Sequence, residues 1–166
     1  MNTIIVLALL IFSAPVLAQE RFTPEQREAR YYYDLGPKAA DVTSYPKEQQ
    51  ENYQIFAKTC SQCHTSARAL NSPLVSREDW RRFIKRMHAR AKMRAGAAIN
   101  REAAQAAIDF LAYDSQVRKV KDKAGFAART SELKILFAEV LRERARIQLE
   151  EDKKKVQEPA PYTGVK

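Results

Sequence analysis

Two cysteines and a histidine stand close together in the string Cys60-Ser61-Gln62-Cys63-His64. They are the only two cysteines of the chain, and His64 is one of only two histidines. Two thiols three residues apart lie on the same side of a helical turn. Such a pair can form a disulfide, act as a redox couple, bind zinc, or form thioethers with the two vinyl groups of a haem, whose iron the adjacent imidazole can then reach.

The rest of the sequence favours the last of these chemistries. A thioredoxin-type redox couple needs a βαβ context, and no strand pattern surrounds the two cysteines. A structural zinc site needs four ligands, whereas the only other histidine is the isolated His88. A simple disulfide between Cys60 and Cys63 is the plainest alternative. We expect covalent haem attachment, because the whole string fits it and an export signal precedes it.

The motif of Cys60, Cys63 and His64 resembles the attachment site of mono-haem c-type cytochromes. The resemblance covers about Lys47 to Val120. It implies an all-α, cytochrome c-like helical domain around one covalent haem c, with two cysteine thioethers and His64 as the proximal iron ligand. It also implies one-electron transfer rather than enzymatic catalysis, either as a carrier or as a subunit of an oxidoreductase.

The distal iron ligand has two candidates downstream of His64. A thioether ligand raises the haem potential and suits electron transfer, which points to Met87 or Met93. Met87 shares an apolar helix stripe with Trp80, and the string from Trp80 to Met87 resembles a subset of exported cytochromes. The spacing of Met93 to Leu111 resembles the mitochondrial type instead. We expect Met87, because its face agrees with the apolar stripe.

Other residues have secondary roles in this interpretation. His88 is predicted to be exposed, and Trp80, Phe56 and Phe110 are predicted to pack against the haem. A second hypothesis is a five-coordinate haem protein, a gas sensor or a peroxidase-like enzyme. That hypothesis would leave His88 as the only distal acid or base.

The N-terminus has the pattern of a secretory signal. An apolar run over residues 4–12 is followed by Pro15 and a small-residue ending at Ala18. The run is far shorter than the roughly 20 residues of a spanning helix. We therefore expect an exported, periplasmic protein with no transmembrane span after cleavage.

Residues that typically begin and end helices recur along the mature chain. We expect a short helix from Thr23 toward Tyr33 and a second helix with the cysteine pair at its C-terminal end. A third helix is capped by Ser76 and closed by Gly96, a fourth is capped by Asn100, and a long one starts at Thr130 or Ser131. The predicted organisation is a signal peptide over 1–18, an N-terminal extension over 19–47, the cytochrome c domain over 48–120, and an amphipathic helical extension with a polar tail over 121–166.

The chain is basic, with 29 Lys and Arg against 20 Asp and Glu and a net charge of +9. Positive residues crowd the helix after Ser76. They form either a solvated helix face or a docking surface for an acidic redox partner, and we expect no nucleic-acid partner for an exported protein. They are Arg77, Arg81, Arg82, Lys85, Arg86, Arg90, Lys92 and Arg94.

The C-terminal helix carries Leu133, Phe137, Val140 and Ile147 on one side. Two roles are open for this face. It covers the cytochrome core, or it docks to a partner subunit or to a second copy of the chain.

Overall fold

The computed structural model describes residues 21–157. The predicted signal peptide and the end of the polar tail lie outside these residues. Within them every regular element is helical, which confirms the all-α prediction, and no helix has the length and apolarity to cross a membrane. The elements are α1 (Pro24–Arg27), the 3-10 turn η1 (Tyr32–Leu35), α2 (Lys47–Cys60), α3 (Ala67–Leu70), α4 (Arg77–Ala91), α5 (Arg101–Ser115), the π-helical turn η2 (Gln116–Lys121) and α6 (Lys123–Gln157).

Side-chain caps begin the helices where the sequence predicts them. The Ser76 hydroxyl accepts a hydrogen bond from the Asp79 N–H over 3.0 Å, and the Asn100 side chain accepts one from the Ala103 N–H over 2.7 Å. Each cap satisfies a donor that the helix itself cannot. The prediction that Gly96 closes α4 is wrong, because the helix ends at Ala91. Gly96 lies in the following turn with φ +79°.

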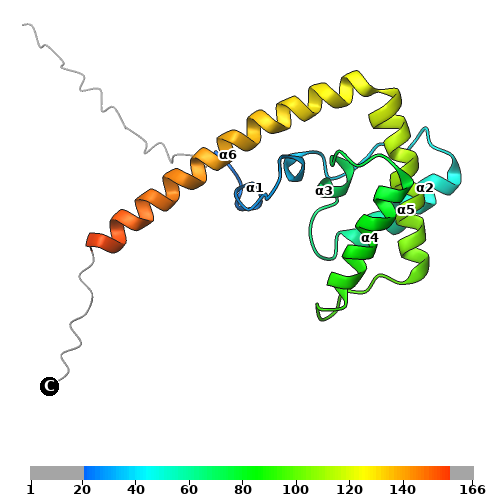
Figure 1. The fold of residues 1–166 in the computed structure, drawn as a ribbon, viewed down its shortest axis with the longest axis horizontal. Helices are drawn as coiled ribbons and strands as arrows, with labels where there is room; N and C mark the ends of the chain where they lie inside the picture. The colour runs from blue at the N-terminus through cyan, green and yellow to red at the C-terminus, as the bar shows by residue number, and fades with distance from the viewer. Residues whose placement is uncertain (1–20, 158–166) are drawn as a thin grey trace, which may run out of the picture.

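Helices α2, α4 and α5 enclose the main core, as Figure 1 shows. Phe56, Trp80, Phe110 and Leu111 are fully buried in it. The rings of Phe56 and Phe110 lie 5.1 Å apart between centroids and join α2 to α5. Burial of one such side chain is worth about 1.5–3 kcal/mol, so these four fix how the helices pack.

A buried polar network ties α5 and η2 to the end of α3 and to the segment before α2. Asp114 is fully buried and accepts hydrogen bonds from the Tyr45 hydroxyl at 3.0 Å and from Arg118 at 2.6 and 2.7 Å. Arg118 also donates to the Leu70 carbonyl. Because every partner is satisfied, the network holds the end of α5 in one position.

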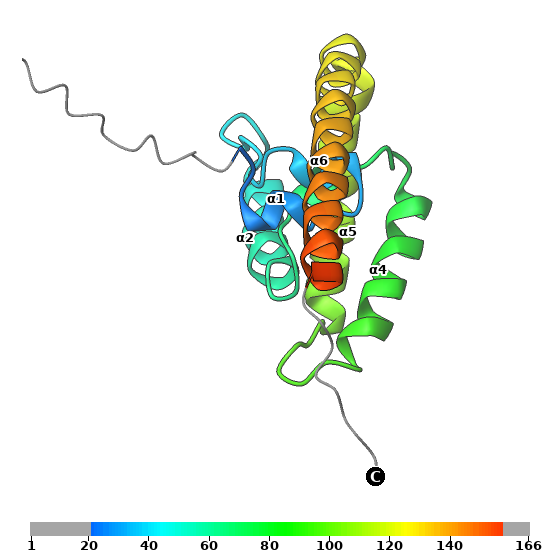
Figure 2. The ribbon, with the colours of Figure 1, turned by 90° about the vertical axis from the view of Figure 1, so that its left-hand side faces the viewer.

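The long C-terminal helix starts earlier than predicted. It begins at Lys123, and Thr130 and Ser131 lie inside it. The turn at Asp122 separates α6 from η2, and the Asp122 carboxylate caps the new helix by accepting from the Gly125 N–H at 3.1 Å. After this turn α6 runs away from the three-helix core, and α1 lies beside it (Figures 1 and 2).

The N-terminal segment does not form the single predicted helix from Thr23 toward Tyr33. It folds into the separate turns α1 and η1, and both contact α6. The predicted apolar face of α6 therefore meets the N-terminal segment. It does not cover the main core. Leu133, Phe137 and Ile147 of this face are only half-buried, so docking to a partner stays a prediction. Phe22, Ala29 and Val140 are buried in this second contact, outside the main core.

Candidate functional site

Cys60, Cys63 and His64 line a cleft of about 490 Å³, which we call the cysteine cleft. Helix α2 delivers Cys60 at its last residue, and the turn that follows carries the other two. This volume lies within the roughly 300–1,000 Å³ of pockets that bind small molecules and cofactors. The cleft is therefore large enough for a cofactor.

Three parts of the chain form its walls. The first is the end of α2 with the turn to α3, and the second is the inner face of α4 with the loop after it. The third is the N-terminal segment. The α4 wall and its loop provide the side chains Phe83, Met87, Arg90, Ala91, Arg94, Ala97 and Ile99.

The two cysteine sulfurs are not bridged, and their surroundings differ. Both thiols are free, with Cys63 exposed and Cys60 partly buried. Burial, reinforced by the neighbouring Cys63, raises the pKa of the Cys60 thiol to about 12. Reactive dithiols have a lowered pKa instead. Cys60 thus lacks the lowered thiol pKa of a reactive redox cysteine, and neither sulfur is held in a disulfide.

His64 is held in one tautomer. Its Nδ1 lies 2.9 Å from the Thr65 carbonyl oxygen. Because a carbonyl only accepts, Nδ1 carries a proton in this contact, and in the neutral imidazole Nε2 then keeps its lone pair. Metal-binding histidines are oriented by this kind of N–H···O contact, in which the second ring nitrogen is the ligand.

The two candidate methionines lie in different surroundings. Met87 is half-buried and lines the cysteine cleft, on the same α4 face as Phe83. Met93 lies beyond the end of α4, where 89% of it is exposed, and it does not line the cleft. Only Met87 shares the cleft with His64.

His88 departs from its prediction. It is half-buried rather than exposed, and its Nδ1 donates to the Ile99 carbonyl over 2.9 Å. It does not line the cleft. The histidine instead fastens the loop after α4 to the helix, which positions Ile99 as part of the cleft wall.

Trp80, Phe56 and Phe110 belong to the main core, and none of them lines the cleft. The aromatic side chain that does is Phe83, which sequence analysis overlooked. Its position four residues before Met87 could have indicated it, because residues four apart lie on one helix face.

Five of the eight residues of the basic cluster fall into two groups. Arg77 pairs with Asp109, and Arg81 and Arg82 lie near acidic residues of the first turn of the helix. Arg90 and Arg94 instead line the cleft, and Arg94 donates to the Cys63 carbonyl at 3.4 Å. The α4 cluster thus contributes positive charge to the cleft only from its C-terminal half. Arg30 and Arg68 also line the cleft, together with the carboxylates of Glu25, Glu28 and Asp34.

Comparison of the chain with protein-family models, with curated proteins and with solved structures gives no match. Within residues 21–157, no three Cys, His, Asp or Glu side chains form a group suited to holding a metal ion. Inference about function therefore starts from the cysteine cleft itself.

Proposed function

We propose that the protein is an exported mono-haem c-type cytochrome that transfers single electrons. The observation that carries the proposal is the orientation of His64. Its Nδ1 proton is engaged by the Thr65 carbonyl, so Nε2 is the free nitrogen, and its ring lines the same cleft as both cysteine thiols. An axial ligand needs this tautomer.

Cys60 and Cys63 would hold the haem covalently. Each thiol adds across one vinyl group, with its sulfur bonding to one vinyl carbon and its hydrogen transferred to the other, so no oxidant is needed. The free state of both thiols and their common cleft support this assignment. When bound, the haem supplies a ferric–ferrous couple whose potential its axial ligands and surroundings set.

Met87 is the distal ligand in this proposal. Its half-buried position on the cleft wall supports it over the exposed Met93. A thioether ligand would raise the potential and occupy the coordination position that an enzymatic haem keeps open. The apolar neighbours Phe83 and Ala91 would limit water at this side of the site.

Electron exchange would take place with an acidic partner protein in the periplasm. Arg90 and Arg94 line the cleft, whereas Arg77 and Arg82 form ion pairs with acidic side chains. Positive charge beside a redox site accelerates encounter with an anionic surface, and added salt weakens the effect.

Optical spectra of the wild type, Met87→Ala and Met93→Ala test the distal ligand. We expect a low-spin, six-coordinate haem with the weak sulfur-to-iron band of a methionine ligand. Met87→Ala removes that band, and the matched variant Met93→Ala keeps it. A high-spin wild type that binds carbon monoxide readily would contradict the proposal and favour a gas sensor or a peroxidase-like enzyme.

A further inference from the structure

One wall of the cysteine cleft comes from outside the region that resembles a cytochrome. Residues of the N-terminal segment line the cleft together with the cysteines and His64. They are Glu25, Glu28, Ala29, Arg30 and Asp34. This segment precedes α2, so its place in the wall depends on contacts with the rest of the chain.

The first fastening joins η1 to α3. Asp34 accepts two hydrogen bonds from the Arg68 guanidinium, at 2.7 and 2.8 Å, and two more from the backbone N–H groups of Arg30 and Tyr31. Burial alone would raise the pKa of Asp34, but these hydrogen bonds outweigh it and hold the pKa below its usual value. A bidentate pair of this kind fixes direction as well as distance.

The second fastening joins α1 to α6. The Arg144 guanidinium donates to the carbonyls of Arg27, the last residue of α1, and of Ala29, two residues further on. Ala29 is itself a residue of the cleft wall. Arg144 therefore holds the backbone at the point where the segment reaches the cleft.

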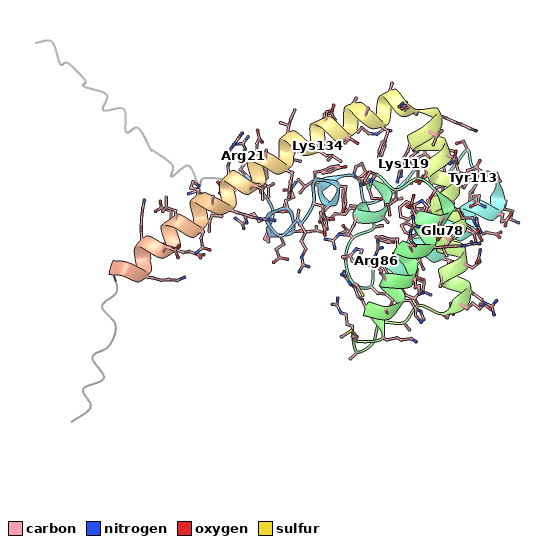
Figure 3. All side chains as sticks on the ribbon, in the orientation of Figure 1. Arg21, Glu78, Arg86, Tyr113, Lys119 and Lys134 are labelled. Carbon is pink, nitrogen blue, oxygen red and sulfur yellow. The ribbon has the colours of Figure 1, made fainter. Side chains whose placement is uncertain are left out.

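Further contacts along α6 reinforce this attachment. Arg21 pairs with Glu139 at 2.9 Å, and the Lys134 ammonium lies 5.4 Å from the centroid of the Tyr32 ring. Figure 3 shows Arg21 and Lys134 along α6, away from the α4 side of the molecule. Both extensions of the chain thus meet each other, and one of them lines the cleft.

We propose that residues 21–35 are a cover of the cysteine cleft that limits the entry of small exogenous ligands, and that Arg144 is the positioning residue that keeps this cover closed. The first part rests on the proposed function, because it concerns ligands of a haem iron. The second part concerns only how the protein chain is held, and is testable without a cofactor.

Hydrogen exchange of the full chain prepared without haem tests whether Arg144 holds residues 21–35 in place. Arg144→Ala removes both guanidinium contacts, and we expect amides of residues 21–35 to exchange about tenfold faster, while those of α2 and α5 do not change. Arg144→Lys keeps the charge and should recover part of the protection. Arg142→Ala is the matched control, since Arg142 is an exposed arginine of the same helix. Unchanged exchange in Arg144→Ala would overturn the positioning role of Arg144.

Cyanide binding to the ferric haem-loaded Met87→Ala protein, in which the methionine no longer occupies the distal position, tests the cover. In that background we expect added Arg144→Ala to make cyanide binding about tenfold faster and added Arg142→Ala to leave the rate unchanged. Faster exchange without faster cyanide binding would overturn the role of the cover. If the chain binds no haem at all, the proposed function fails, while the exchange result still decides whether Arg144 positions residues 21–35. Asp34→Asn loosens the opposite end of the segment and should act in the same direction if Arg144→Ala does not fold.

Discussion

The ammonium group of Lys119 lies 4.9 Å from the centroid of the Trp80 ring, inside the protein. It donates hydrogen bonds to the carbonyls of Ser72 and Leu74, at 2.9 and 3.0 Å. Figure 3 shows Lys119 close to the bend between α5 and α6. A single buried lysine therefore joins the π-helical turn, the core tryptophan and the loop before α4.

Stability should rise with pH through Lys119. Burial lowers the pKa of this lysine to about 7, an effect that Asp114 opposes and Arg118 reinforces. The unfolded chain keeps the proton until about pH 10.4, so between these values it binds more protons than the folded protein. The stabilising contribution is complete above the unfolded pKa and is lost as pH falls through the folded one.

Urea unfolding of the wild type and Lys119→Met measures this dependence. Between pH 7.5 and 9.5 the free energy of unfolding of the wild type should increase relative to the variant by up to about 1.4 kcal/mol per pH unit. Taking the difference between the two proteins removes the titration of groups common to both. A difference that stays constant with pH would contradict a depressed lysine pKa.

Asp114→Asn should destabilise the fold strongly. The substitution removes the buried charge that Arg118 and Tyr45 face and leaves the half-buried Arg118 guanidinium without its partner. Breaking a buried ion pair in this way costs about 3–5 kcal/mol. Asp109→Asn is the control, because its pair with Arg77 is partly exposed, and we expect it to cost less than about 1 kcal/mol. Equal losses in urea unfolding would argue against the buried network.

Gly36→Ala should disturb the link between the N-terminal segment and α3. An added Cβ would come within 2.4 Å of the Asn71 side chain, which is buried and donates to the carbonyls of Pro37 and Ala67. Displacing a packed side chain costs about 1–3 kcal/mol. At Gly125 the Cβ meets the carboxylate of exposed Asp122, which can move aside at the loss of its hydrogen bond to the Gly125 N–H, so Gly125→Ala should cost less in thermal unfolding. Indistinguishable midpoints would contradict the tight packing at Gly36.

Reversing charge at the cleft should slow electron exchange. Arg90→Glu with Arg94→Glu places negative charge on the cleft wall, and we expect the rate with an acidic redox protein to fall about tenfold or more at low salt. Arg81→Glu with Arg82→Glu changes the net charge equally, but at the end of α4 whose arginines face acidic residues. Stopped-flow rates at several ionic strengths separate the two cases. Equal slowing by both variants would indicate a general charge effect instead of a local docking site.

Local signals made the central helices predictable from sequence. Caps at Ser76 and Asn100 are short-range hydrogen bonds, so their residue types and spacing suffice to place the starts of α4 and α5. The stripe through Trp80 and Ile84 also has the helical period, and both residues are buried. The cysteine string and Met87 could be predicted as one site for the same reason, since each lies on or beside a clearly patterned helix.

Long-range contacts explain what the sequence did not predict. The place of α6 depends on the turn at Asp122 and on Arg144 reaching two carbonyls more than a hundred residues earlier in the chain. Neither contact produces a repeating pattern of residue types in the sequence. The role of His88 was missed for a similar reason, because its burial comes from the Ile99 carbonyl in a loop without regular structure.

The most direct test of the central claim is the mass of the peptide that carries the motif. Trypsin cuts after Lys58 and Arg68, which releases residues 59–68 with both cysteines. The full chain is expressed with its export signal in cells that attach haem to a reference c-type cytochrome. We predict that the peptide then carries the added mass of one haem. The double variant Cys60→Ser with Cys63→Ser should lack this added mass. Recovery of the unmodified peptide from the wild type, while the reference cytochrome from the same cells is loaded, would contradict the account.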